Sequence, residues 1–187
     1  MSKSKEIVKF IEKFKAAKTS TINTIFYNSL RYTQSKLKKM TEYGELQRVR
    51  DYYTFEYIYY VGSKPRQMRH RLLLTDFYAK MIEVGIDIVL FENEYSEVPN
   101  IRPDGFVAYS YNDSNYVAFI ETERSNKLDI GKYKKLYESG DFFKRFPNAQ
   151  SFPRLIAVTD KKVTPIQEFK VVKIKEDFSN INNLIQG

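Results

Sequence analysis

The 187-residue chain contains no cysteine and only one histidine. The absence of cysteine excludes disulfides, thiolate chemistry and cysteine-based zinc sites, and one histidine is too few for a histidine-rich metal site. Any bound metal must therefore be held mainly by carboxylates. No apolar run approaches the length needed to span a membrane. The sequence also lacks a glycine-rich phosphate loop and any serine, histidine and aspartate arrangement with usable spacing.

The first residues, Met-Ser-Lys-Ser-Lys-Glu, lead directly into an amphipathic pattern and lack the apolar stretch of a secretory signal. We therefore expect a soluble, cytoplasmic protein. The formal charge of +8 is unevenly distributed, because residues 1–65 contain 13 basic and 6 acidic side chains whereas residues 66–187 contain 18 and 17. This asymmetry predicts that the N-terminal part meets a polyanion while the remainder has another role.

Helical periodicity dominates the N-terminal part. Four apolar residues recur at the spacing i, i+3, i+4 and i+7 of an amphipathic helix: Ile7, Phe10, Ile11 and Phe14. The polar cluster Thr19–Thr21 is expected to cap a short second helix. A third helix is predicted over residues 30–43, with Gly44 as its C-terminal stop. A hairpin follows, with its strands at residues 46–50 and 57–61.

Three helices followed by a hairpin are typical of a winged helix-turn-helix domain, which we predict over residues 1–62. In that arrangement the third helix enters the major groove of double-stranded DNA, where outward side chains read base edges or bind phosphates. The outward residues are Arg31, Tyr32, Gln34, Ser35, Lys38 and Lys39. Arg48 and Arg50 of the hairpin would contact the DNA backbone. The alternative is a solvated three-helix packing module that binds no DNA.

A second domain is predicted over residues 66–187, because Pro65 stops the preceding element and the charge balance changes there. Its patterns follow the order helix, strand, strand, strand, helix, strand. We expect these elements at residues 66–84, 86–91, the two arms of a hairpin within 101–124, a helix from about 128, and 154–159. A last edge strand is expected at residues 171–174. The hairpin arms are rich in Phe, Val, Tyr and Ile, and the polar residues Asn112–Asn115 form the expected turn.

The hairpin carries three acidic residues. Asp104 opens the first arm directly after Pro103, and Glu121 and Glu123 point to one face of the second arm because they are two residues apart. Carboxylates on a half-buried surface repel each other and lose hydration unless a cation lies between them. Such oxygen ligands suit Mg²⁺ or Mn²⁺. The alternative is that Glu123 and Arg124 are solvated or ion-paired charges on an exposed rim.

These residues resemble a known signature. Pro103-Asp104, a hairpin and then Glu121-x-Glu123 resemble the PD-(D/E)xK nuclease motif, with Glu123 where a lysine usually stands. More narrowly, RPDG, FIETER and a following helix that begins with KY, behind a winged-helix start, resemble the replication-relaxation proteins of plasmids and phages of Gram-positive bacteria. The resemblance implies an α/β (α+β) chain in which a restriction-endonuclease-like αβββαβ domain follows the winged helix.

The resemblance also implies further site residues. Glu83, at the end of the helix before the sheet, would be a metal ligand beside the three hairpin carboxylates. Glu123 would act as an additional ligand or as a general base. A basic residue on the helix after the hairpin would replace the missing strand lysine, for which Lys132, Lys134 and Arg124 are candidates. We assign catalysis to the three hairpin carboxylates and Lys134.

Three functions are compatible with these features. The first is a Mg²⁺-dependent nuclease that nicks or relaxes DNA in plasmid or phage replication, as the resemblance implies. The second is a non-enzymatic transcription regulator or replication accessory that retains an inactive nuclease-like domain. In the third, the C-terminal sheet only recruits another replication protein. A homodimer that reads two DNA half-sites is a further expectation for a winged-helix protein.

Overall fold

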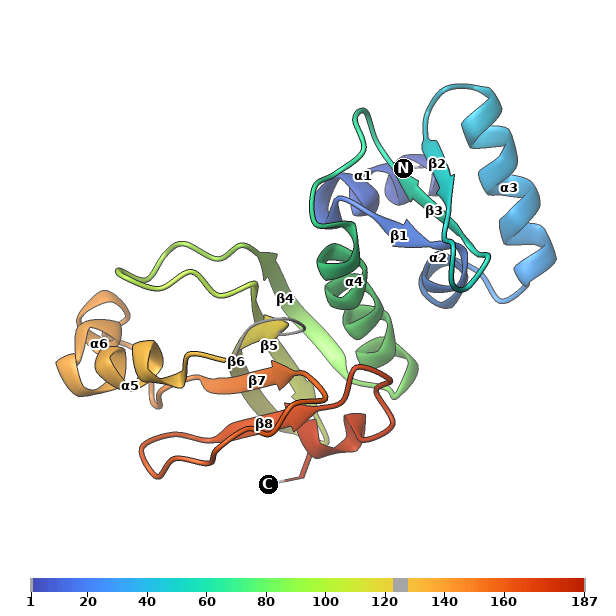
Figure 1. The fold of residues 1–187 in the computed structure, drawn as a ribbon. Helices are drawn as coiled ribbons and strands as arrows, with labels where there is room; N and C mark the ends of the chain where they lie inside the picture. The colour runs from blue at the N-terminus through green and yellow to red at the C-terminus, as the bar shows by residue number, and fades with distance from the viewer. Residues whose placement is uncertain (1, 123–127, 187) are drawn as a thin grey trace. The chain divides into compact units, whose positions relative to one another are not determined.

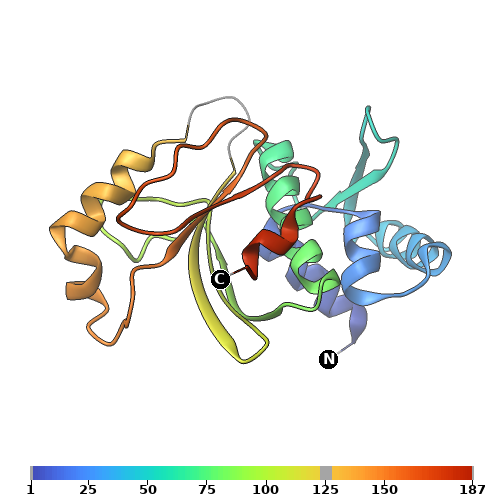
Figure 2. The same cartoon turned by 90° about the horizontal axis from the view of Figure 1, so that it is seen from below.

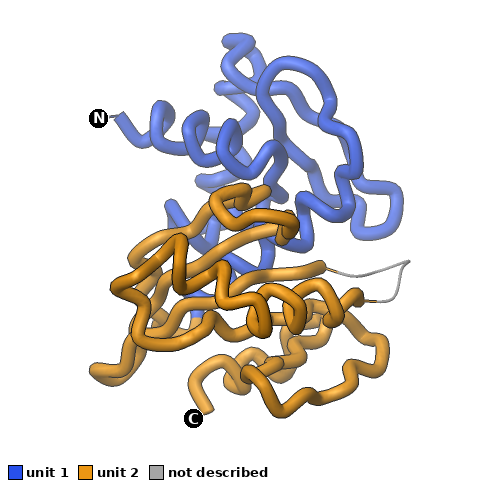
Figure 3. The backbone as a smooth tube through the Cα atoms, turned by 90° about the vertical axis from the view of Figure 1, so that its left-hand side faces the viewer, with its two compact units in different colours: residues 1–83 blue, residues 84–187 orange. Residues whose placement is uncertain are grey.

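Residues 2–122 and 128–186 are described by the computed structural model of the chain. The chain divides into two units, residues 1–83 and residues 84–187 (Figure 3). Each unit combines helices with a β-sheet (Figure 1), so the expected mixed α/β class is confirmed. Among the described residues, no helix is both long and apolar enough to cross a membrane.

The first unit packs its helices around a small antiparallel sheet with the strand order β1-β3-β2. Its elements are α1 (Lys3–Phe14), β1 (Ala17–Lys18), α2 (Thr19–Phe26), α3 (Leu30–Glu42), β2 (Gln47–Arg50), β3 (Tyr57–Tyr60) and α4 (Met68–Glu83). Ile7 and Ile11 of α1 pack with Leu37 and Met40 of α3 and with Tyr59 of β3. The apolar periodicity of the sequence therefore marks the faces of α1 and α3 that form this core.

Both ends of α3 are determined by local sequence. Ser29 is the N-cap, and its hydroxyl oxygen accepts a hydrogen bond from the backbone N–H of Tyr32 at 3.4 Å. At the other end, Gly44 has φ +74° and donates its N–H to the Thr41 carbonyl. The next N–H, that of Glu45, returns to the Met40 carbonyl at 2.9 Å. This pair of bonds is a Schellman motif, and it confirms the predicted stop at Gly44.

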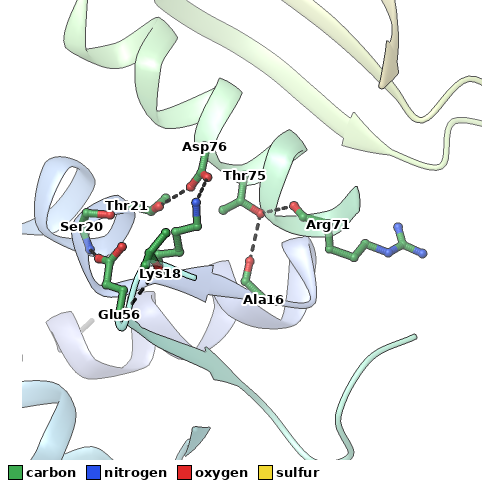
Figure 4. Close-up of polar contacts among 9 residues, drawn as sticks. Ala16, Lys18, Ser20, Thr21, Glu56, Arg71, Thr75 and Asp76 are labelled. Atoms are coloured by element: carbon green, nitrogen blue, oxygen red, sulfur yellow. Dashed lines mark hydrogen bonds and ion pairs between the residues drawn. The ribbon is translucent and has the colours of Figure 1, made fainter. Parts of the chain in front are cut away.

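The start of α2 differs from the prediction. The hydroxyls of Thr19–Thr21 do not cap the helix; the Thr21 hydroxyl instead donates to the Asp76 carboxylate at 2.6 Å. The carboxylate of Glu56, which precedes β3, accepts the N–H of Ser20 at 2.5 Å (Figure 4). A negative charge at this end also suits the helix dipole. A residue more than thirty positions away thus supplies the cap that the local cluster was expected to provide.

Helix α4 belongs to the first unit. Asp76 also pairs with Lys18, with 2.6 Å between the carboxylate oxygen and the ammonium nitrogen. The Thr75 hydroxyl lies 2.9 Å from the Ala16 carbonyl and 2.7 Å from the Arg71 carbonyl (Figure 4). These contacts tie α4 to β1 and α2, so the division falls after Glu83 and not at the expected boundary between residues 62 and 66.

The second unit contains, among its described residues, a sheet of five strands in the order β4-β5-β6-β7-β8. Its elements are β4 (Asp87–Asn93), β5 (Gly105–Tyr111), β6 (Ser114–Thr122), α5 (Ile130–Ser139), α6 (Asp141–Arg145), β7 (Arg154–Val158), β8 (Val171–Ile174) and the 3-10 helix η1 (Ile181–Leu184). Strands β4 to β6 form an antiparallel meander, and β7 and β8 add in parallel. The connection from β6 to β7 runs through α5 and α6, which lie on one face of the sheet (Figure 2).

The predicted hairpin of β5 and β6 is confirmed, but its turn is shorter than expected. Tyr111 pairs directly with Ser114, which leaves Asn112 and Asp113 as the only turn residues. Their φ angles are +45° and +60°. Two successive residues in the left-handed region are typical of a type I′ turn, whose twist matches that of the strands. The strands therefore extend two residues further into the polar sequence than composition indicated.

Phe119 of β6 is the centre of the second unit's core. It is fully buried, and its ring contacts the rings of Phe106 on β5, Tyr133 on α5 and Phe142 on α6 at centroid distances of 5.7, 5.4 and 6.2 Å. These contacts fix α5 and α6 on the same sheet face as Phe119. Because side chains alternate along a strand, Glu121 lies on this helix-covered face as well.

Candidate functional site

The side of α3 that was predicted to face outward is exposed in the structure. Thr33, Leu37 and Met40 are buried on its inner side. All six residues predicted to point outward are exposed: Arg31, Tyr32, Gln34, Ser35, Lys38 and Lys39. The charged and amide groups among them remain at the surface, and the Lys38 ammonium has a loose contact of 3.8 Å with Glu42. The helix therefore presents a cationic face with hydrogen-bonding side chains.

The two hairpin arginines have different surroundings. Arg48 is half-buried, and its guanidinium lies over the Tyr57 ring at 4.3 Å from the centroid. Arg50 is exposed, and its Nε donates to the Phe55 carbonyl at 3.1 Å. Arg50 is the more accessible of the two for an external anion, whereas the Arg48 guanidinium also packs within the hairpin.

The charge asymmetry is sharper with the observed division of the chain. Residues 1–83 contain 17 basic and 8 acidic side chains, a balance of +9. Residues 84–187 contain 14 and 15, a balance of −1. The net positive charge of the protein is therefore carried by the unit that contains α3 and the β2–β3 hairpin, which favours a polyanionic ligand for that unit.

Two of the predicted carboxylates come together at the ends of neighbouring strands. Gly105 of β5 pairs with Ile120 of β6, and one further step of the same register places Asp104 beside Glu121. Asp104 Oδ2 accepts hydrogen bonds from the backbone N–H and the hydroxyl of Thr122, at 2.7 and 2.8 Å. Glu121 is only 4% exposed. The expected burial is therefore observed for Glu121, whereas Glu123, which was expected beside it on the same face, lies outside the described residues.

Helix α5 supplies the groups that neutralise Glu121. The Lys132 ammonium lies 2.6 Å from Glu121 Oε1, and the Tyr133 hydroxyl donates to the same oxygen at 2.5 Å. Burial raises the pKa of Glu121, and the nearby charge of Asp104 raises it further, whereas Lys132 and Tyr133 oppose the shift. Burial and the charge of Glu121 also raise the pKa of Tyr133, so its hydroxyl remains a proton donor.

The other predicted members of this site have different surroundings within the described residues or lie outside them. The Lys134 ammonium contacts Glu168 at 2.5 Å, so the basic residue brought to Glu121 is Lys132 and the assignment of Lys134 is corrected. Glu83 ends α4 in the first unit and pairs with Lys80 at 2.9 Å. Glu123, expected as an additional ligand or a general base, and Arg124, one of the three candidates for the missing lysine, belong to the segment that the structure does not describe.

The remaining pair of carboxylates offers oxygen ligands of the type that hard divalent cations prefer. Within residues 2–122 and 128–186, no three carboxylate or histidine side chains gather closely enough to hold a metal ion. Mg²⁺, however, commonly uses one or two carboxylates and completes its shell with waters and substrate phosphates. Asp104 and Glu121 would be those ligands. The Lys132 ammonium provides the counter-charge for Glu121 in the structure.

Comparison with known proteins adds no assignment. No protein family, curated protein or solved structure matches this chain.

Tyr133 was not expected at the site, and Lys132 was only one of three basic candidates. The helical spacing of α5 distinguishes Lys132 from Lys134. Tyr133 and Leu136 are the buried residues of α5, and Lys132 lies four positions before Leu136 on the same side. Lys134 is exposed on the other side. A strict reading of the 3.6-residue period would have selected Lys132 for the inward role.

Proposed function

We propose that this protein binds double-stranded DNA through its first unit, used as a winged helix-turn-helix domain. The observation that carries the proposal is the exposure of all six polar and basic residues on the outer face of α3. The element order helix, strand, helix, helix and hairpin supports the same domain type. In it α3 would enter the major groove and the β2–β3 hairpin would be the wing.

The charge distribution supports the same proposal. A balance of +9 over residues 1–83 would attract the phosphate backbone and release its counter-ions, which gives affinity independent of sequence. Arg31 and Gln34 have the donor and acceptor groups that read guanine and adenine edges in the major groove. Lys38 and Lys39 near the end of the helix would bind phosphates.

Fluorescence anisotropy with a labelled duplex tests this proposal. We expect affinity to fall steeply between 50 and 200 mM salt, as it does on the order of 10³-fold for proteins with several phosphate contacts. The variant Lys38→Ala/Lys39→Ala should bind more weakly and show a slope of log affinity against log salt that is smaller by about 2. Equal affinity and slope in the wild type and this variant would contradict the proposed role of α3.

A matched control separates a specific contact from net charge. Lys5 and Lys9 are exposed on α1, so Lys5→Ala/Lys9→Ala removes the same charge from another helix of the same unit. We expect the control variant to retain most of the affinity and nearly the full salt slope. If both variants lose affinity equally, the protein is attracted to DNA by its net charge alone, and α3 is not the helix that contacts the bases.

For the second unit we propose a nuclease-like site, which would make the protein a Mg²⁺-dependent DNA nickase. The specific observation in its favour is the convergence of Asp104, Glu121 and a lysine at the ends of β5, β6 and α5. The antiparallel meander, the crossover through α5 and the parallel β7 are the order expected for a restriction-endonuclease-like fold. Nicking or relaxation during plasmid or phage replication is the role that the family resemblance implies.

In this proposal the chain's residues have distinct tasks. Asp104 and Glu121 would hold Mg²⁺, which when bound polarises a phosphate and makes a coordinated water more acidic. Thr122 orients the Asp104 carboxylate through two hydrogen bonds. Lys132 reaches Glu121 from the neighbouring helix and would replace the lysine that is missing from the strand.

Incubation with supercoiled plasmid in the presence of Mg²⁺, Mn²⁺ or EDTA tests the second site. We expect metal-dependent nicking that is lost in Asp104→Asn and Glu121→Gln. Lys132→Ala should also lose activity, whereas Lys134→Ala should retain it because Lys134 faces Glu168. No conversion with either metal, while DNA binding stays intact, would exclude the nickase and favour the non-enzymatic regulator or accessory, in which Lys132 permanently neutralises Glu121.

A further inference from the structure

The tip of the β2–β3 hairpin exposes aromatic side chains that the core does not need. Tyr52, Tyr53 and Phe55 are 83%, 69% and 66% exposed. The Tyr52 and Tyr53 rings contact each other nearly at right angles, with 5.5 Å between centroids. Three large rings on one short loop form a concentrated apolar surface, and such surfaces commonly mark interaction sites.

Hydrogen bonds hold this tip in one conformation. The Asp51 N–H donates to the Glu56 carbonyl at 2.8 Å, and the Phe55 N–H donates to the Asp51 carbonyl at 3.0 Å. The Asp51 carboxylate accepts the N–H of Tyr53 at 3.0 Å, a bond that lowers the pKa of Asp51. Phe55 has φ +56°, a left-handed conformation that costs a non-glycine residue energy. The rings are therefore presented by a pre-organised loop.

Two arginines lie close to rings of the tip. The Arg69 guanidinium lies 4.4 Å from the Tyr53 ring centroid, and that of Arg50 lies 5.8 Å from the Phe55 centroid. The five tip residues, 51–55, contain no lysine or arginine of their own. Its one charged residue, Asp51, directs a carboxylate oxygen to the Tyr53 N–H within the loop. The surface thus combines exposed aromatic rings with two neighbouring arginines, an arrangement suited to a ligand that has both flat apolar faces and negative charge.

We propose that this aromatic tip, residues 51–55, stacks on unpaired bases beside the duplex bound by α3. The inference rests on the proposed DNA-binding function of the first unit. Base faces are inaccessible within a stacked duplex, whose grooves present only base edges. Unpaired bases offer their faces, and aromatic side chains stack on them with little dependence on sequence. Arg50 and Arg69 complement the adjacent phosphates. The protein would then prefer DNA in which a duplex adjoins a single-stranded segment.

Anisotropy measurements with the full chain test this preference. One probe is a labelled 30-base-pair duplex, and the other is the same duplex with a central bubble of six unpaired thymidines. Stacking on a single base is expected to increase affinity for the bubble about 5- to 150-fold. In Tyr52→Ala/Tyr53→Ala the ratio of the two affinities should fall to about one. Circular dichroism spectra that match the wild type would show that the variant is folded.

Tyr43→Ala is the control, because Tyr43 is also a highly exposed tyrosine of the first unit but lies outside the tip. It should retain the bubble preference. A 2-aminopurine base placed in the bubble gives a direct readout, since stacking on tyrosine should quench its fluorescence in the wild type and the control but not in the double variant.

Several results would overturn the inference. If the wild type binds duplex and bubble with equal affinity, the stacking inference is wrong, whereas the proposed binding of duplex DNA by α3 still stands. If Tyr52→Ala/Tyr53→Ala keeps the bubble preference, residues other than these two tyrosines cause it. Binding to phosphatidylcholine and phosphatidylglycerol vesicles that requires the two tyrosines, without a bubble preference, would make the tip a membrane contact. Failure to bind either DNA would refute the proposed function and this inference together.

Discussion

Replacement of Lys132 by methionine tests how Glu121 is held in the second unit. The change removes the ammonium and keeps an unbranched side chain. Removal of one partner from a fully buried ion pair costs about 3–5 kcal/mol. This pair is only partly buried, because the Lys132 side chain is 28% exposed and that of Glu121 is 5% exposed. Tyr133 also continues to donate to Glu121 in the variant. We therefore expect the free energy of unfolding to fall by a smaller amount, about 2 kcal/mol at pH 7. The melting temperature should fall by roughly 4–8 °C.

The loss should depend on pH in a defined direction. Burial raises the pKa of Glu121 above its value in the unfolded chain. The stability contributed by protonated Glu121 is therefore fully present below the ordinary glutamate pKa of 4.5 and is lost as pH rises through the folded value. Without Lys132 the folded pKa rises further. The variant should thus be most destabilised at pH 7 and close to the wild type at about pH 4 or below.

Urea and thermal denaturation followed by circular dichroism at pH 4 and pH 7 measure this effect; the chain has no tryptophan to report by fluorescence. Lys135→Met is the matched control, because Lys135 is exposed on the same helix, and its stability should change by no more than about 0.5 kcal/mol. A destabilisation of Lys132→Met that is equal at both pH values, or absent at pH 7, would refute the ion pair as the support of Glu121.

Three further changes test individual contacts. Tyr133→Phe removes the hydroxyl that donates to Glu121, and urea denaturation at pH 7 should show a loss of about 1–3 kcal/mol, with a smaller loss at pH 4. Asp76→Asn removes the charge that pairs with Lys18, and we expect a loss of about 1 kcal/mol that shrinks in high salt. Leu37→Ala leaves a cavity beneath α3, and thermal melting should show a loss of about 2–5 kcal/mol. No change in melting would contradict the described packing of α3.

Elements that depend on neighbouring residues were predictable from the sequence. The amphipathic spacing in α1 and α3 marks the side chains that form the first core, and Gly44 ends α3 through bonds within its own last turn. The outward residues of α3 follow from the same period. The apolar arms of β5 and β6 and the acids at their ends were equally visible, because strand alternation places Phe119 and Glu121 on one face.

Contacts between distant residues were decided only by the tertiary structure. Composition cannot show that Glu56 caps α2 or that Asp76 joins α4 to the first unit. The helical period places Lys132 rather than Lys134 on the inner side of α5, but that this side meets Glu121 depends on the packing of Tyr133 against Phe119. The sequence by itself determined which groups the site could contain. The packing of α5 on β6 decided which of these groups meet, because burial selects one face of a helix and leaves the other faces in solvent.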